Sequence, residues 1–216
     1  MNINYENNNN AHVRGTIITE PLFSHEILGE GFYDLTIKVP RLSEQFDLLP
    51  VTISERLLGE TKIGDTLSID GQFRSYNKLE DGKSKLILTL FAKELVDDED
   101  DINSNTITLT GYICKSPIYR TTPFGREICD CLIAVNRAYN KSDYIPCIAW
   151  GRNARFVKNL DVGSKVTITG RIQSREYQKK YDENNIETKT AYEVSISSIG
   201  INSDEFEIDE FDSVDD

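Results

Sequence analysis

Two large aromatic side chains and an arginine lie close together between Asp143 and Arg152, in a segment that reads as a β-strand running into a polar turn. Side chains alternate between the two faces of a strand, so Tyr144 and Trp150 share one face. The opposite face is predicted to be core, and it carries Ile145, Cys147 and Ala149. An exposed ring can stack on a nucleic-acid base while a neighbouring cation meets its phosphate. The alternative is ordinary packing, because a tryptophan in a strand is more often buried than exposed.

A second stretch of similar character covers residues 173–185, where cations are interleaved with tyrosines. Arg175, Tyr177, Lys179 and Lys180 lead to a polar tip, which is typical of a hairpin arm. Such an arm could extend along a nucleic-acid strand. The alternative is a solvated loop whose tyrosines pack on the body of the domain.

The net charge of −12 is concentrated in two segments. Residues 97–101 are all acidic, and residues 203–216 contain eight acids and no base. Residues 1–96 have a net charge of −4, whereas residues 105–202 have a net charge of +5. A polyanion is therefore expected to bind the second half of the chain.

Matching residues recur at a constant spacing, which indicates a duplicated domain. Gly15 matches Gly111 at a spacing of 96, and the run at 64–71 matches the run at 163–170 at a spacing of 99. The period is too long for a solenoid repeat, so each copy is expected to have its own core.

Within each copy the predicted strands are short and separated by turn signals. The second copy is expected to form strands at 106–113, 127–136, 144–150, 165–173 and 191–199. A helix from Asn153 to Leu160, capped by Asn153, is expected between the third and fourth strands. This is the order of an OB barrel. The predicted fold class is all-β, with two tandem OB-fold barrels that carry one short helix each.

The predicted domain boundaries follow the repeat and the charge. They are a disordered N-terminus at 1–10, a diverged OB domain at 11–96, an acidic linker at 97–104, a second OB domain at 105–202 and a disordered acidic tail at 203–216.

The residue types do not favour an enzyme. The four cysteines form no C-x-x-C pair and are expected to be small buried side chains in a reducing cytoplasm. The two histidines, His12 and His25, lie outside the second copy, and no glycine-rich phosphate loop or Gly-x-Ser-x-Gly signature occurs. We therefore predict no catalysis, metal or cofactor. Since no signal peptide or apolar span is visible, we expect a cytoplasmic protein that does not associate with a membrane.

Several segments of the second copy occur together in one known family. They are Leu-Thr-Gly at 109–111, Val-Asn-Arg at 135–137, the strand and turn from 143 to 154, and the run from 163 to 177. In this order and spacing, residues 105–200 resemble the bacterial single-stranded DNA-binding proteins. The resemblance implies base-stacking rings at Tyr144, Trp150 and Tyr177, and a looser match at Tyr139. The candidate phosphate contacts are the basic residues of this barrel, namely Arg137, Arg152, Arg171, Arg175, Lys179 and Lys180.

The first copy departs from the family pattern. Ser54 stands opposite Trp150, and Leu48 stands opposite Tyr144. The remaining candidate contacts are Arg41, Arg74 and Tyr76. The residues expected in the core or at a subunit interface are Phe32, Tyr33, Phe46 and Phe73. The first barrel is therefore expected to bind DNA weakly or mainly to scaffold the assembly.

The resemblance also implies partners. Four barrels assemble in the family, so two barrels per chain predict a homodimer with four barrels. The acidic tail corresponds to one that docks replication and repair proteins, and its candidate contacts are Phe206, Phe211, Asp215 and Asp216. It lacks the family's terminal Pro-Phe, and the alternative is a tail that only promotes solubility.

The predicted function is sequence-independent binding and protection of single-stranded DNA in replication, recombination and repair. It would act by base stacking and phosphate neutralisation, in the cytoplasm at the nucleoid. The alternative is a double-OB scaffold or accessory factor of a replication-restart or recombination complex, with nucleic-acid binding secondary. RNA stays open as a ligand, because OB folds also bind RNA.

Overall fold

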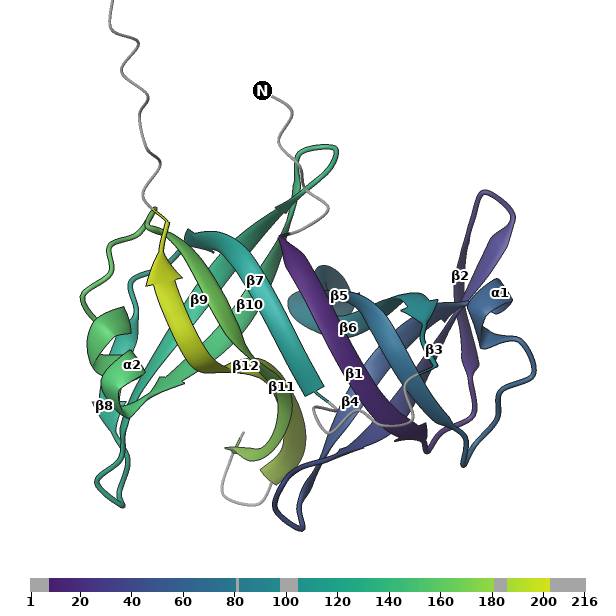
Figure 1. Cartoon of the computed structure of the whole chain (residues 1–216), viewed down its shortest axis with the longest axis horizontal. Helices are drawn as coiled ribbons and strands as arrows, with labels where there is room; N and C mark the ends of the chain where they lie inside the picture. The colour runs from purple at the N-terminus through teal and green to yellow at the C-terminus, as the bar shows by residue number, and fades with distance from the viewer. Residues whose placement is uncertain (1–7, 81, 98–104, 181–185, 203–216) are drawn as a thin grey trace, which may run out of the picture.

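The computed structural model of the chain describes residues 8–80, 82–97, 105–180 and 186–202, and Figure 1 shows two β-barrels side by side. The first barrel contains β1 (Asn9–Ile17), β2 (Leu22–Ile27), β3 (Glu30–Pro40), β4 (Phe46–Ser54), α1 (Glu55–Leu58), β5 (Thr66–Glu80) and β6 (Lys83–Leu95). The second contains β7 (Asn105–Ile113), β8 (Ile118–Thr121), β9 (Glu127–Arg137), β10 (Lys141–Trp150), α2 (Gly151–Val157), β11 (Lys165–Lys180) and β12 (Ile186–Ile201). In these described ranges no helix has the length and apolar character needed to cross a membrane.

Each barrel closes because its first strand pairs with two others. β1 pairs with β5 along most of its length and with β3 at Thr16 and Ile17. β7 pairs with β11 in the same way and with β9 at Tyr112 and Ile113. The strand orders are β1-β3-β4-β6-β5 and β7-β9-β10-β12-β11, each returning to its first strand. This is the OB order, which confirms two tandem OB barrels with a short helix each.

Several predicted boundaries are wrong. The helix begins at Gly151, and Asn153 does not cap it, because its amide donates to the carbonyl of Ser197 at 3.0 Å. The short strands β2 and β8, each paired with the strand that follows it, were not predicted. The predicted arm is a continuation of β11 and β12, which pair as far as Lys180 and Ile186.

The first barrel also begins earlier than predicted. β1 starts at Asn9, inside the segment expected to be disordered. The Asn9 side chain is buried and makes two hydrogen bonds to the backbone of Phe73, at 2.8 and 2.9 Å. Asn105 repeats these bonds with Ile172 in the second barrel. This asparagine is therefore a repeated structural element that ties β1 to β5 in the first barrel and β7 to β11 in the second.

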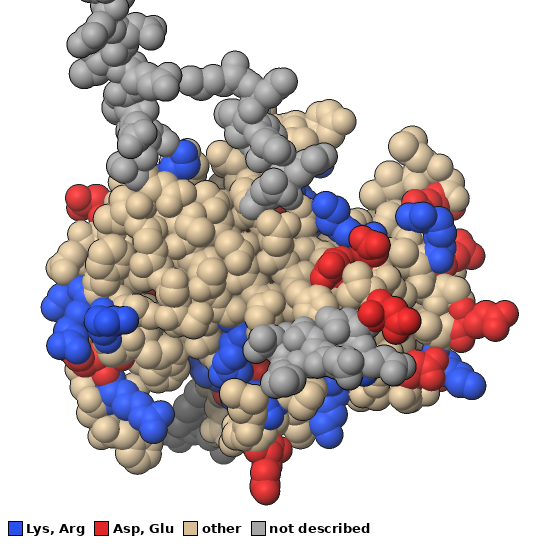
Figure 2. Space-filling model, viewed as in Figure 1, with Lys and Arg blue, Asp and Glu red and all other residues tan. Residues whose placement is uncertain are grey.

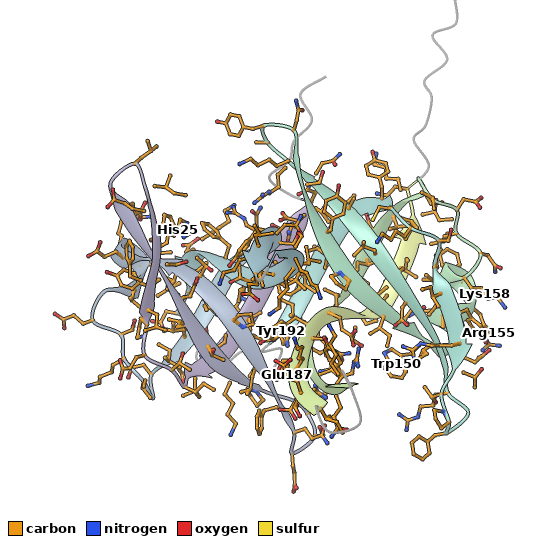
Figure 3. The ribbon with its side chains drawn as sticks, turned by 180° about the vertical axis from the view of Figure 1, so that it is seen from behind. His25, Trp150, Arg155, Lys158, Glu187 and Tyr192 are labelled. Carbon is orange, nitrogen blue, oxygen red and sulfur yellow. The ribbon has the colours of Figure 1, made fainter. Side chains whose placement is uncertain are left out.

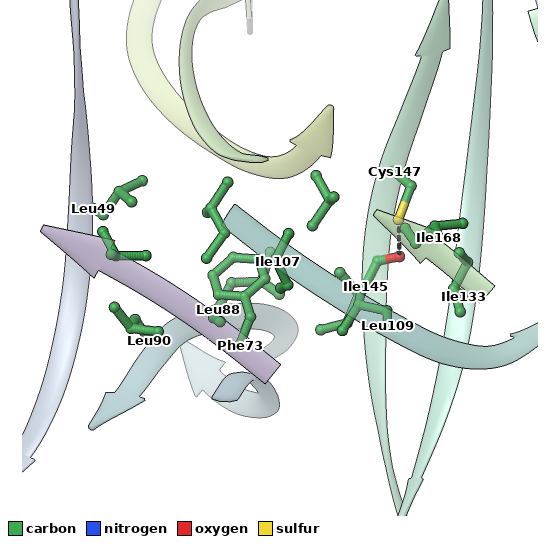
Figure 4. Packing of buried hydrophobic residues seen from close by; sticks show 14 of the residues in the cluster. Leu49, Phe73, Leu88, Leu90, Ile107, Leu109, Ile133, Ile145, Cys147 and Ile168 are labelled. Atoms are coloured by element: carbon green, nitrogen blue, oxygen red, sulfur yellow. Dashed lines mark hydrogen bonds between the residues drawn. The ribbon is translucent and has the colours of Figure 1, made fainter. Parts of the chain in front are cut away.

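The alternation of side chains predicted for the barrel strands is present in the core. Ile145, Cys147 and Ala149 are buried, and so are Cys129 and Cys131, whereas Cys114 is half-buried. Burial raises the pKa of the Cys129 thiol to about 11, with smaller contributions from Cys131 and Asp130. Instead of a separate core in each copy, one continuous cluster of buried side chains runs through both barrels, part of which Figure 4 shows.

Two matching glycines allow each barrel to bend. Gly71 and Gly170 follow register shifts in β5 and β11. A Cβ at Gly170 would lie 2.3 Å from the carbonyl oxygen of Ser195, and one at Gly71 would lie 2.3 Å from that of Phe91. Only glycine fits such a close approach of two backbones.

The barrels are joined through their first strands. β1 and β7 pair antiparallel, with Asn9 opposite Leu109, Ala11 opposite Ile107 and Val13 opposite Asn105. Ala11 and Ile107 hold the same position in the repeat, so the pairing is self-complementary. We call this junction the seam. It has the geometry of a two-fold symmetric interface formed within one chain.

A buried aspartate from the first barrel holds one side of the seam. Asp47, which has no exposed side-chain area, accepts hydrogen bonds from Arg41 Nε and from the backbone N–H of Ser174, both at 2.8 Å. Arg171 Nη1 lies 3.2 Å from the same carboxylate, and the Leu48 N–H donates to Ser174 Oγ at 2.9 Å. β4 of the first barrel is therefore fixed against β11 of the second.

The matching aspartate of the second barrel holds the other side. Asp143 is also fully buried and accepts a hydrogen bond from the backbone N–H of Ser75 at 2.7 Å. Arg137 Nε lies 3.3 Å from its other oxygen, and the Tyr144 N–H donates to Ser75 Oγ at 2.7 Å. Burial raises the pKa of the Asp143 carboxyl, although the Ser75 N–H, Arg137 and Arg74 oppose the shift.

This raised pKa predicts a pH dependence that asparagine should remove. A folded carboxyl with a raised pKa holds its proton more tightly than the unfolded chain does, so its contribution to stability falls as pH rises through that pKa. Relative to Asp143→Asn, which keeps the acceptor for Ser75, the wild type should lose free energy of unfolding as pH rises from about 4 upward. Urea unfolding of both proteins from pH 4 to 7 measures this difference. The free energy of unfolding of the wild type minus that of Asp143→Asn should fall as pH rises. A value that stays constant or increases with pH would contradict the prediction.

Candidate nucleic-acid interface

Trp150 ends β10 and precedes α2, where its ring is 38 % exposed. Its Nε1–H donates to Ser195 Oγ at 3.3 Å, which orients the ring across β12 (Figure 3). Tyr144 lies on the same face of β10 and is 44 % exposed. Both rings are thus outside the core, as the alternation predicts.

The other two predicted rings lie apart from Trp150. Tyr177 is on the extended part of β11, 39 % exposed, with the Arg175 guanidinium 6.0 Å from its ring centroid. Tyr139 is almost fully exposed, with φ of 61° between β9 and β10, at the opposite end of β10 from Trp150. The predicted rings are therefore distributed along β10 and the hairpin.

The predicted cations fall into two groups. Arg137 and Arg171 are engaged with Asp143 and Asp47 at the seam. Burial lowers the pKa of the Arg171 guanidinium, and nearby Arg41 adds to this effect. The second group consists of exposed side chains, namely Arg152, Arg175 and Lys179. The side chain of Lys180 lies outside the described part of the chain.

A groove of about 680 Å³ lies between the two barrels, where β4 meets β11, beside Trp150. The second barrel lines it with Trp150, Arg171 and Arg175, and the first barrel lines it with Arg41, Phe46 and Leu48. We call it the cross-barrel groove. Its size is in the range of ligand-binding clefts.

Phe46 was missed by sequence reasoning, which placed it in the core or at a subunit interface. It is 46 % exposed, and Lys38 Nζ lies 4.2 Å from its ring centroid. Strand alternation carried the signal, because Asp47, Leu49 and Val51 form the buried face of β4. An aspartate on the buried face obscured that pattern.

A further group of cations lies around α2 and β8, where sequence reasoning named only Arg152. Figure 2 shows basic side chains gathered over these elements, whereas acidic ones predominate over the first barrel on this face. Lys158 Nζ is 4.8 Å from the Tyr119 ring centroid, and Arg155 pairs with Glu127 at 3.2 Å. The uneven charge of the two halves is thus visible on the surface.

The other first-barrel residues named from the sequence differ in their surroundings. Ser54 caps α1 by accepting a hydrogen bond from the Leu57 N–H at 3.4 Å. The Arg74 guanidinium lies 3.6 Å from the Phe91 ring centroid, and Tyr76 is 47 % exposed. Phe32 and Phe73 are buried, and Tyr33 packs against the core.

The tail residues Phe206, Phe211, Asp215 and Asp216 lie outside the described residues. Among residues 8–80, 82–97, 105–180 and 186–202, no group of three or more His, Cys, Asp or Glu side chains could hold a metal ion.

The fold and its exposed rings and cations define an OB-fold protein with a surface suited to single-stranded nucleic acid. Residues 104–201, which include the whole second barrel, match the single-strand binding protein family. Single-stranded DNA-binding protein 1 of Staphylococcus aureus (strain COL) is 37 % identical over 83 residues, which are 35 % of this chain and 50 % of that protein. Single-stranded DNA-binding protein A of Bacillus subtilis (strain 168) is 35 % identical over 83 residues, 35 % of this chain and 48 % of that protein. The chain thus spans about half the length of these relatives.

The likeness to a solved structure extends over both barrels. The wild-type single-stranded DNA binding protein from Thermus aquaticus superposes with a TM-score of 0.68 at 16 % identity, covering 90 % of this chain and 93 % of that chain. A deletion mutant of the same protein gives a TM-score of 0.71 at 18 % identity and covers 94 % of this chain and 98 % of that one. The fold of the first half, which lies outside the family match, is therefore supported too.

Proposed function

We propose that this chain binds single-stranded DNA without sequence preference and protects it during replication, recombination and repair. The observation that carries the proposal is the exposed ring of Trp150, held by Ser195 at the edge of a groove that Arg175 also lines. A base stacked on such a ring contributes about 1–3 kcal/mol, and neighbouring cations neutralise the phosphates. No catalytic step is part of this function.

The chain's single tryptophan makes the test direct. Titration with oligo-dT should quench the fluorescence of Trp150, and the affinity should fall as salt is raised, because phosphate contacts release counterions. Oligo-U and a DNA duplex of the same length are the comparisons for RNA and for double strands. Absence of both quenching and binding at low salt would contradict the proposal.

We also propose a homodimer with four barrels and a cytoplasmic location, where single-stranded DNA is produced in bacteria. The proposal draws on the family of the second half and on the pairing logic of closed oligomers. Docking of replication and repair proteins on the acidic tail belongs to the same proposal.

A further inference from the structure

We propose that the first barrel forms part of the DNA path, through Phe46 and Arg41 in the cross-barrel groove. The inference deepens the proposed function and rests on it. Single-stranded DNA would stack one base on Trp150, cross the seam and stack another on Phe46. The diverged barrel is then a direct contributor to binding at this one place.

The groove has the two components that a single strand requires. Rings lie in both walls, because Trp150 comes from the second barrel and Phe46 from the first, with 38 % and 46 % of their surfaces exposed. Arg41 and Arg171 line the groove with them, and so does Arg175, whose side chain is 53 % exposed and whose Nε lies 3.6 Å from Glu193. This combination of aromatic platforms and cations is how proteins hold single strands.

The groove is also rigid where β4 of the first barrel meets β11 of the second. Asp47 binds Arg41 and Arg171 from opposite barrels and the backbone of Ser174. The adjacent bond from Leu48 to Ser174 fixes the strand that carries Phe46. A preorganised site avoids part of the entropy cost of binding.

The duplicated fold alone does not explain these residues. At the matching junction on the other side of the seam, Trp150 is replaced by Ser54 and Phe46 by Ser142. Arg171 and Arg175 correspond there to Gln72 and Tyr76. That junction has Tyr144 in the place of Leu48 and Arg137 in the place of Arg41, so what is specific to the cross-barrel groove is the pair of rings Trp150 and Phe46.

Two acids also line the groove, Glu44 and Glu176, and they give a test of the opposite sign. A phosphate passing Arg175 would be repelled by the neighbouring carboxylate of Glu176. Glu176→Gln is therefore expected to tighten binding to oligo-dT about two- to fivefold at low salt. The gain should diminish at high salt, because screening weakens the repulsion.

The main test compares two phenylalanines of the first barrel. Phe46→Ala should weaken oligo-dT binding about tenfold, the loss expected for one stacked base. Phe23→Ala is the matched control, because Phe23 is 62 % exposed on β2 but does not line the groove. It should bind like the wild type. Phe46→Tyr, which keeps a ring, should restore affinity.

Trp150 fluorescence separates the possible failures. If oligo-dT quenches Trp150 in the wild type but Phe46→Ala binds equally well, the cross-barrel path is overturned while the proposed function stands. If the wild type shows neither quenching nor binding, the proposed function itself fails. Urea unfolding of each variant checks its fold. Should Phe46→Ala prove unstable, Glu44→Gln tests the path independently, because Glu44 lines the groove from the first barrel and its removal should likewise tighten binding at low salt.

Discussion

Alanine in place of Trp150 is expected to weaken binding of single-stranded DNA about ten- to a hundredfold. The estimate follows from about 1–3 kcal/mol for a stacked base, where 1.4 kcal/mol corresponds to a tenfold change. Since the intrinsic fluorophore is lost, anisotropy of a labelled oligo-dT measures the affinity. Because only 38 % of the residue is exposed, the free energy of unfolding should also fall, and urea unfolding of the variant checks that it remains folded.

Trp150→Phe is the matched control for this change. It keeps an aromatic face and removes only the Nε1–H that donates to Ser195. Affinity should stay within a few-fold of the wild type. If alanine and phenylalanine lowered affinity equally, the hydrogen bond and not stacking would be the contribution of Trp150. If alanine had no effect, the ring would lie outside the DNA path.

Alanine at Gly170 is expected to destabilise the second barrel by about 3 kcal/mol or more. The added Cβ would lie 2.3 Å from the carbonyl oxygen of Ser195 and 3.0 Å from its carbon. Because both contacts are backbone atoms, β11 and β12 must separate at the register shift beside Gly170. Overpacking in a well-packed site typically costs 1–3 kcal/mol, and a backbone clash this short is more severe. Urea unfolding monitored by Trp150 fluorescence measures the loss.

Gly200→Ala provides the comparison, because a Cβ there meets nothing within 4 Å. It removes a glycine from β12, the strand that pairs with β11 beside Gly170. Its free energy of unfolding should be close to that of the wild type. Equal losses in the two variants would show that the glycines matter through chain flexibility and not through space.

The number and type of barrels could be predicted from the sequence because the duplication keeps its spacing. Gly15 and Gly111, 96 residues apart, mark the same position in the two copies. Alternation on β10 also placed Tyr144 and Trp150 outside the core correctly. Both signals are local or depend on comparing the chain with itself.

The seam could not be predicted, because it depends on contacts between residues far apart in the chain. Nothing near Asp47 indicates that its partners include Ser174, and nothing near Asp143 indicates Ser75. The cross-barrel groove depends on the contact between the barrels, so the exposed position of Phe46 beside Trp150 could not be predicted. The helix start was misplaced because Gly151 takes a φ of 53°, which allows the chain to turn before Asn153.

Pairing of β1 with β7 makes barrel association intramolecular. Two separate barrels would meet at a rate set by their concentration, and dilution would part them. When one chain carries both barrels, each is held at a high effective concentration near the other. Their association then does not depend on the concentration of the protein. Tethering also relaxes the requirement that both halves stay alike. One barrel is then free to change its surface while the other keeps its own, and a symmetric ancestor can become an asymmetric, directional binding unit.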